Sequence, residues 1–212
     1  MKDTPLSHTP LLIVTAAWMI GIVLSGYAPH DRLTWLMEVV PVLIALPLLW
    51  TIGRRFVFSD LVYGLILFHG LVLILGGAYT YARVPPGFWV QDWLGLDRNP
   101  YDRFAHLIQG FVPAFIAREL LLRRFALPRG PLLGFLVVCI CLAISASYEI
   151  IEWGAALIMG GSMDAFLGTQ GDPWDTQADM GIALVGAAAT LANNGERRPK
   201  YRDGPIIKVS LS

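Results

Sequence analysis

Carboxylates and one histidine recur at helical spacing in three segments of this chain. Within each segment their positions differ by three or four residues, and they are Asp102 and His106, then Ser145, Glu149 and Glu152, then Asp175 and Asp179. Side chains at this spacing share one face of an α-helix. An oxygen-rich set with a single histidine suits Mg²⁺, Mn²⁺ or Ca²⁺ better than zinc, whose sites draw on more His or Cys. The pattern therefore predicts a site for a divalent metal.

The predicted site has metal ligands and candidate catalytic residues. The predicted ligands are Asp102, His106, Glu149, Glu152, Asp172, Asp175 and Asp179. Among them, His106, Glu149 and Glu152 are the candidate catalytic residues, because a histidine or a carboxylate can act as general base beside a metal that activates water or neutralises a phosphate. This chemistry describes a metal-dependent hydrolase or transferase acting on a lipid or cell-envelope substrate, and whether the chain is an enzyme is open at this stage.

The same residues admit two other interpretations. Acids and histidines inside membranes also form cation or proton pathways, which His69 would extend, so a cation- or proton-coupled transporter is the first alternative. The second is a non-catalytic membrane protein whose acids cap helices and form structural pairs. Asn99 and Asp172 each precede a proline at the start of a predicted helix, as N-cap residues do. Capping does not explain His106 and Asp179, one turn deeper in each helix.

An arginine also stands beside the acids in the sequence. Arg103 follows Asp102 directly and could hold an anionic group. Contact with a lipid headgroup or with a carboxylate is the simpler alternative for this arginine.

The composition indicates that the elements positioning these residues are membrane helices. Of the 212 residues, 55% are hydrophobic and only 15% are charged, whereas soluble domains are about 25% charged. A net charge of zero gives no reason to expect nucleic acid as a partner, and two cysteines cannot form a disulfide scaffold. Membrane lipid is the expected partner.

Six segments approach the roughly 20 apolar residues that a helix needs to cross a bilayer. They span about residues 10–27, 33–53, 61–81, 101–122, 131–159 and 174–193. None alternates as the strands of a barrel do, so the sequence predicts an all-α, polytopic transmembrane helical bundle with about six transmembrane helices. We expect a single six-helix transmembrane domain over residues 1–195, followed by a cytoplasmic polar tail over 196–212.

The basic residues predict the orientation of this bundle. Twelve of the sixteen Lys and Arg fall before the first span, around the second and fourth connections, and in the tail. Cytoplasmic connections carry the excess of basic residues, so both termini are predicted to be cytoplasmic in a bacterial inner membrane, with the acids toward the outer face. In the third connection, Phe88, Trp89 and Trp93 predict a short helix at the outer interface.

Glycines in the predicted helices indicate close packing. Gly76 and Gly77, and Gly181 with Gly186, allow helices to approach one another. No Walker or dinucleotide-binding pattern surrounds them, so a phosphate-binding loop is not predicted.

The motifs also resemble a known family. YDRFAH at 101–106, YEIIEW at 148–153 and GTQGDPWDTQ at 168–177 resemble the YjdF-like bacterial inner-membrane proteins, a family without an established function. The order of the acidic motifs is also similar, more distantly, to VanZ-like membrane proteins associated with glycopeptide resistance. The resemblance implies a multi-pass protein of the bacterial inner membrane and implies no reaction.

Overall fold

The computed structural model describes residues 8–159 and 169–193. Within these ranges the chain forms helices and no strand, and the helices are α1 Thr9–Tyr27, α2 Arg32–Gly53, α3 Asp60–Tyr79, α4 Pro85–Leu94, α5 Tyr101–Arg123, α6 Pro131–Met159 and α8 Asp175–Asn193. The predicted all-α fold class is confirmed, and each long helix begins and ends close to its predicted segment. The predicted polar tail at 196–212 lies outside the described residues.

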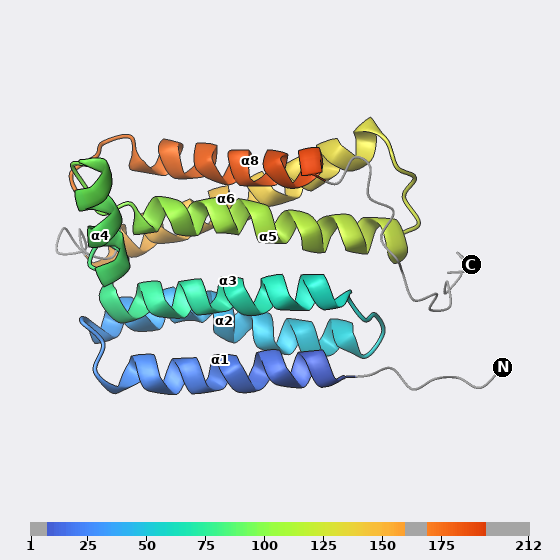
Figure 1. Cartoon of the computed structure of the whole chain (residues 1–212), viewed down its shortest axis with the longest axis horizontal. Coiled ribbons are helices and arrows are strands. Elements are labelled where there is room, and N and C mark those ends of the chain that lie inside the picture. Colours follow the sequence, from blue (N-terminus) through green and yellow to red (C-terminus); the bar gives the residue numbers. More distant parts are fainter. Residues whose placement is uncertain (1–7, 160–168, 194–212) are drawn as a thin grey trace.

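The long helices run side by side along one axis (Figure 1). Helices α1, α2 and α3 pack together in one half of the bundle, and α5, α6 and α8 pack together in the other. Contacts between α3 and α5 join the halves. Helix α4 lies across the end of the bundle at which α5 and α8 begin, as the aromatic residues of the third connection predict.

Five of the helices are long and apolar enough to cross a membrane: α1, α2, α3, α5 and α6. Helix α8 has 19 residues, which is also long enough, but it carries Asp175 and Asp179 in its first turns and is rich in alanine. It packs along α5 and α6. A sixth span at α8 therefore stays a prediction.

Two indole nitrogens in the first half donate hydrogen bonds to neighbouring helices, whereas Nε2 of His69 in α3 is buried with no hydrogen-bond partner among the described residues. The indole nitrogen of Trp18 in α1 donates to the carbonyl oxygen of Leu67 in α3 at 3.1 Å, and the indole lies against Gly70. The indole nitrogen of Trp50 donates to the hydroxyl of Thr15 at 3.1 Å. Pairing inside the bundle removes the cost of unsatisfied donors in lipid.

Helices α5 and α8 make the closest approach in the bundle. A Cβ atom added at Gly110 would overlap the carbonyl oxygen of Ala183, and one added at Gly186 would overlap the carbonyl oxygen of Leu107. The hydroxyl of Thr190 donates to the carbonyl oxygen of Phe111 at 3.0 Å across the same interface. This contact lies deeper in both helices than the predicted site and fixes the spacing of the two helices that carry it.

Helix α3 ends two residues earlier than the segment predicted from the sequence. Thr80 and Tyr81 adopt left-handed backbone conformations, with φ of 56° and 47°, so the helix stops at Tyr79. The ring of Tyr81 folds back onto Gly76, where any Cβ atom would overlap it. Gly76 thus makes room for the ring of Tyr81, which follows the C-terminal end of α3.

Of the other glycines predicted to allow close helix packing, two contact a neighbouring helix within the described residues and one does not. Gly77 faces the Cβ atom of Glu38 in α2, 3.1 Å from an added Cβ, and Gly186 faces α5 as described. An added Cβ at Gly181 would meet no atom of the described residues within 4 Å, so the prediction of packing at that position is wrong for the part of the chain that the structure describes.

The ends of the bundle differ in charge as the orientation prediction requires. The α2–α3 and α5–α6 connections lie at the end where α1 begins and α8 ends, and they carry Arg54, Arg55, Arg124 and Arg129. The acids of the predicted site lie at the opposite end. Which end faces the cytoplasm stays a prediction.

Candidate functional site

Two helix starts at the same end of the bundle are built alike. The side-chain oxygen of Asn99 accepts the backbone amide of Tyr101 at 3.0 Å, and that of Asp172 accepts the amide of Trp174 at 2.9 Å. In both cases a proline separates the acceptor from the donor, and the helix begins within three residues. These hydrogen bonds form turns that lead into α5 and α8. The N-cap position of α5 is Pro100 and has no side-chain cap hydrogen bond, so Asn99 is not its N-cap residue, and capping of α8 by Asp172 stays a prediction.

A pair of amide hydrogen bonds ties these two helix starts together. The backbone amide of Asn99 donates to Oε1 of Gln170 at 3.0 Å, and Nε2 of Gln170 donates to the carbonyl oxygen of Asn99 at 3.0 Å. The side-chain nitrogen of Asn99 also donates to the carbonyl oxygen of Val84 before α4. Asn99 is 1% exposed and thereby joins α4, α5 and the segment leading to α8.

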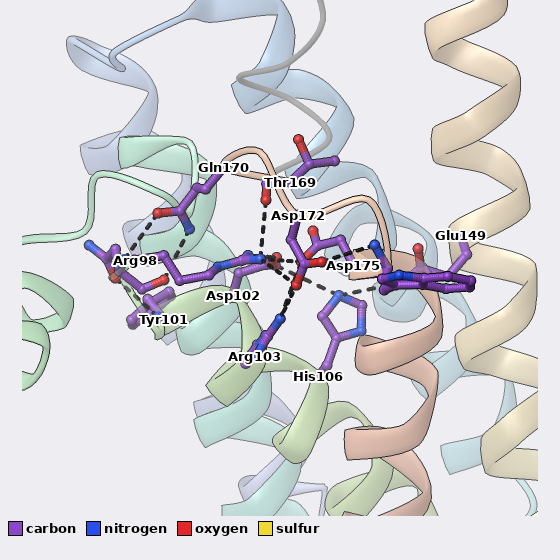
Figure 2. Close-up of polar contacts among 12 residues, drawn as sticks. Arg98, Tyr101, Asp102, Arg103, His106, Glu149, Thr169, Gln170, Asp172 and Asp175 are labelled. Atoms are coloured by element: carbon purple, nitrogen blue, oxygen red, sulfur yellow. Dashed lines mark hydrogen bonds and ion pairs between the residues drawn. The ribbon is translucent and has the colours of Figure 1, made fainter. Parts of the chain in front are cut away.

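Two arginines contact three acids of the site, which are Asp102, Asp172 and Asp175 (Figure 2). Arg98 pairs with Asp175 and lies 3.6 Å from Asp102 and 3.8 Å from Asp172. Arg103 pairs with Asp172 at 2.5 Å and lies 3.9 Å from Asp175. Asp172 and Asp175 are therefore engaged in ion pairs. The contact of Arg103 is with a carboxylate, the simpler of the two alternatives for this residue.

Below these ion pairs, three residues form a buried group. Asp102, His106 and Asp179 each offer one ligand atom, and these atoms lie within 4.8 Å of one another. Asp102 is 7% exposed, His106 6% and Asp179 2%. Nδ1 of His106 and Oδ1 of Asp179 have no hydrogen-bond partner among the described residues. Buried polar atoms are nearly always paired, so these atoms have capacity for a ligand.

Helix α6 supplies a further carboxylate to this group. Oε1 of Glu149 lies 3.7 Å from Nε2 of His106 and has no hydrogen-bond partner in the described part of the chain. Ser145, one turn away on the same face, is fully buried, and its hydroxyl also has no partner there. The stripe predicted on α6 thus faces the stripes of α5 and α8.

A second buried pair links the two halves of the bundle beside this site. The hydroxyl of Tyr148 in α6 donates to Oε2 of Glu38 in α2 at 2.6 Å, and Glu38 is 3% exposed. Glu152, one turn beyond Tyr148, is 8% exposed. No Lys or Arg in the described residues forms an ion pair with Glu38, Glu149, Glu152 or Asp179.

The structure separates the predicted ligands into two groups. It gathers Asp102, His106, Asp179 and Glu149 into one buried group, whereas Asp172 and Asp175 pair closely with arginines. Asp102 belongs to both sets, because it also lies 3.6 Å from Arg98, and only Asp172 is partly exposed. Glu152 is buried on the same helix as Glu149. These residues are placed as the spacing predicts, and their roles as ligands or catalytic groups stay predictions.

Sequence reasoning did not include Arg98, Gln170 or Tyr148 in the site. Arg98 stands four residues before Asp102 in sequence but precedes the start of α5 at Tyr101, so only its nearness to the acids along the chain could have indicated the contact. The contacts of Gln170 and Tyr148 bridge positions 71 and 110 residues apart, and no local pattern indicates them.

The chemical capacity of the site follows from its unbalanced charge. Burying an ionised carboxylate without a partner costs several kcal/mol, on the order of 3 at a helix centre in a membrane. Protonation or a bound cation removes that cost. Three ligand atoms on two helices, with the carboxylate of Glu149 as a fourth donor alongside, match the oxygen-rich coordination that Mg²⁺, Mn²⁺ and Ca²⁺ accept.

Fold and site together define a multi-pass helical membrane protein with a buried acid and histidine group near one end. The chain matches the family described as "Predicted membrane protein (DUF2238)" over residues 10–195, and it belongs to that family. It is 53% identical to the inner membrane protein YjdF of Escherichia coli (strain K12) over 184 residues, which cover 86% of this chain and 88% of the relative. The resemblance to the YjdF-like proteins is confirmed. No solved structure matches the chain.

Proposed function

We propose that this protein binds a divalent metal at the buried group of Asp102, His106 and Asp179 and acts there on a lipid or cell-envelope substrate. The observation that carries the proposal is the convergence of three buried ligand atoms within 4.8 Å, two of them on residues with an unpartnered atom. Glu149 completes the donor set or acts as general base, because its free oxygen faces His106. When bound, the metal would polarise a substrate oxygen or activate water.

We further infer that the site faces the periplasm of a bacterial inner membrane. A relative that is 53% identical is named an inner membrane protein. The connections rich in arginine lie at the end opposite the site, and basic connections favour the cytoplasm. An outer-facing site would meet envelope lipids and their precursors rather than cytoplasmic metabolites.

Metal analysis of the purified protein tests the proposal. Mn²⁺ added to the protein in detergent should lose its free electron paramagnetic resonance signal with saturation near one equivalent, and Mg²⁺ or Ca²⁺ should compete. Asp179→Asn and Glu149→Gln should weaken binding by about tenfold or more, because each removes a charged donor.

An exposed acid provides the matched control. Asp97 lies at the same end of the bundle but is exposed, so Asp97→Asn should leave Mn²⁺ binding unchanged. If the native protein does not bind Mn²⁺, Mg²⁺ or Ca²⁺, or if all three variants bind as the native protein does, the proposed metal site is wrong.

A further inference from the structure

A carboxylate of the chain itself occupies a position suited to an anionic ligand. Oδ2 of Asp172 lies 2.5 Å from Nη2 of Arg103 and 3.8 Å from Nη1 of Arg98, and its Oδ1 accepts the backbone amide of Trp174 at 2.9 Å. Two guanidinium groups and an amide converge on one carboxylate. Guanidinium groups bind phosphate oxygens with the same geometry that they use for carboxylates.

The site is open on the side of Asp172. A pocket of about 340 Å³ lies above the buried group, lined by Thr169, Gly171, Asp172, Pro173, Asp175 and Thr176. The side chain of Asp172 is 28% exposed and that of Arg103 is 33% exposed, whereas the side chain of Asp175 is 5% exposed. Of these acids, Asp172 is the one that can leave its arginine and enter water. Figure 2 shows Asp172 close to both arginines.

One cation of the site keeps donor capacity beyond this ion pair. Nε of Arg103 is buried and has no hydrogen-bond partner among the described residues. A phosphate group has three or four acceptor oxygens, so it can bind Nε and a terminal nitrogen of Arg103 at the same time. The carboxylate of Asp172 contacts Nη2 of Arg103 and leaves Nε without a hydrogen bond in the described part of the chain. Asp175 stays with Arg98 in either state.

We propose that Arg103 and Arg98 form the binding site for the phosphate group of the substrate, and that Asp172 fills this site when the ligand is absent. The assignment of this phosphate to the substrate rests on the proposed function. A divalent metal at Asp102, His106 and Asp179 would offset the repulsion between the phosphate and the neighbouring acids. The substrate class is a phosphate-bearing molecule. It is either a soluble phosphate ester or a lipid whose headgroup ends in phosphate.

The two partners of one ion pair make the test sharp. Arg103→Gln removes the cation that receives the phosphate, so binding of inorganic phosphate by detergent-solubilised protein should fall about tenfold or more, the effect of losing a charge-assisted hydrogen bond. Asp172→Asn removes the competing carboxylate, so phosphate should bind several-fold more tightly. A merely structural ion pair predicts that both variants lower stability and that neither changes phosphate binding.

Equilibrium dialysis with radiolabelled phosphate, with and without Mn²⁺, gives the measurement. Arg83→Gln serves as the control, because Arg83 is an exposed arginine in the connection between α3 and α4. Arg103→Lys keeps the charge and should restore part of the binding, which separates a charge effect from a folding defect. Size-exclusion profiles of all variants establish that the proteins compared are folded.

The outcomes separate this inference from the proposed function. Opposite shifts for Arg103→Gln and Asp172→Asn support the phosphate site. Absence of saturable phosphate binding in the native protein, or shifts in the same direction, overturns it even if Mn²⁺ binds. If the native protein does not bind Mn²⁺, the proposed function is wrong. The phosphate affinities of Arg103→Gln and Asp172→Asn would still test the phosphate site at the arginines.

Vesicles distinguish the two sources of phosphate. Nanodiscs containing phosphatidic acid should displace labelled phosphate from the native protein, in contrast to nanodiscs of phosphatidylcholine alone, if the ligand is a lipid headgroup. Equal phosphate binding in both bilayers, with displacement by soluble glycerol phosphate, assigns the site to a soluble ester. Each result supports the shared phosphate chemistry and identifies its source.

Discussion

Helix α5 carries a polar cluster near each of its ends, and the two clusters differ in how completely their hydrogen bonds are made. At the C-terminal end, Glu119 accepts from the backbone amide and the hydroxyl of Ser59 at 2.7 and 2.6 Å and pairs with Arg123. Arg123 also donates to the carbonyl oxygen of Val57 and stacks on Phe56 at 4.7 Å. At the N-terminal end, His106, Glu149 and Asp179 retain atoms without a hydrogen-bond partner among the described residues.

The difference teaches what a buried charge can indicate in this fold. Both clusters contain an acid buried to about the same degree, at 5% exposure for Glu119 and 6% for Glu149. The first joins α5 to the start of α3 and has its bonding capacity filled by the protein. The second has capacity to spare. Burial alone therefore does not distinguish the two clusters, whereas unfilled bonding capacity does, and it is this capacity on which the proposed ligand site rests.

The largest effect is expected from the filled cluster. Glu119→Ala should lower the free energy of unfolding by about 3–5 kcal/mol, because Ser59 and Arg123 lose their partner inside the bundle. Thermal or denaturant unfolding in detergent would measure it. Mn²⁺ binding should persist in protein that remains folded. Loss of metal binding in such protein would show that the two clusters are not independent.

Metal itself should produce the next effect, at the other cluster. Mn²⁺ at 100 times its dissociation constant should stabilise the native protein by about 2.7 kcal/mol, and a chelator should reverse the shift. Glu119→Gln should gain the same stabilisation from metal as the native protein, since the metal is expected to bind at the N-terminal end of α5 and not at Glu119. A chelator that leaves the unfolding temperature of Mn²⁺-treated native protein unchanged would contradict the contrast.

Separating α5 from α8 should damage only the open cluster. Gly110→Ala places a methyl group against the carbonyl oxygen of Ala183, so we expect about 2 kcal/mol of destabilisation and loss of Mn²⁺ binding. The matched control is Gly181→Ala, because Gly181 faces open space on α8, and it should be neutral or slightly stabilising. Equal unfolding midpoints for the two variants would count against the tight α5–α8 contact.

The smallest effect carries an opposite sign. Asp179→Asn removes a buried carboxylate that has no Lys or Arg partner in the described residues, so the metal-free protein should gain about 1 kcal/mol of stability while its metal affinity falls. Unfolding midpoints measured in chelator test the first half of this statement. A clear loss of stability in metal-free Asp179→Asn would place Asp179 among structural acids such as Glu119.

The sequence predicts the helices and the gathering of acids because both depend on local spacing. Apolar length defines the spans, and the separation of three or four residues places Asp102 with His106 and Asp175 with Asp179 on single faces. Glu119 is also a charged residue within a predicted span. Its partner Ser59 lies 60 residues away in the sequence, and only the folded structure brings the two side chains together. Residue spacing within a helix shows which side chains share a face, but it does not show what the opposite helix presents to them.

Glycines illustrate the same limit. Gly181 and Gly186 both occur in α8, and only Gly186 meets a neighbouring backbone. The direction of each glycine depends on how α8 is rotated about its axis, which the contact with α5 decides. The end of α3 at Tyr79 is equally hard to predict from the sequence. It depends on packing of the Tyr81 ring against Gly76 and not on a helix-breaking residue.

The amide pair between Gln170 and Asn99 has a consequence for motion. A side-chain amide here makes the same two hydrogen bonds that one backbone peptide makes with another in a sheet, so the starts of α5 and α8 are joined as if they were one continuous element. Opening of either start requires both bonds to break. Hydrogen exchange should therefore show the first turns of both helices opening as one cooperative unit, and Gln170→Ala should let each exchange at its own rate.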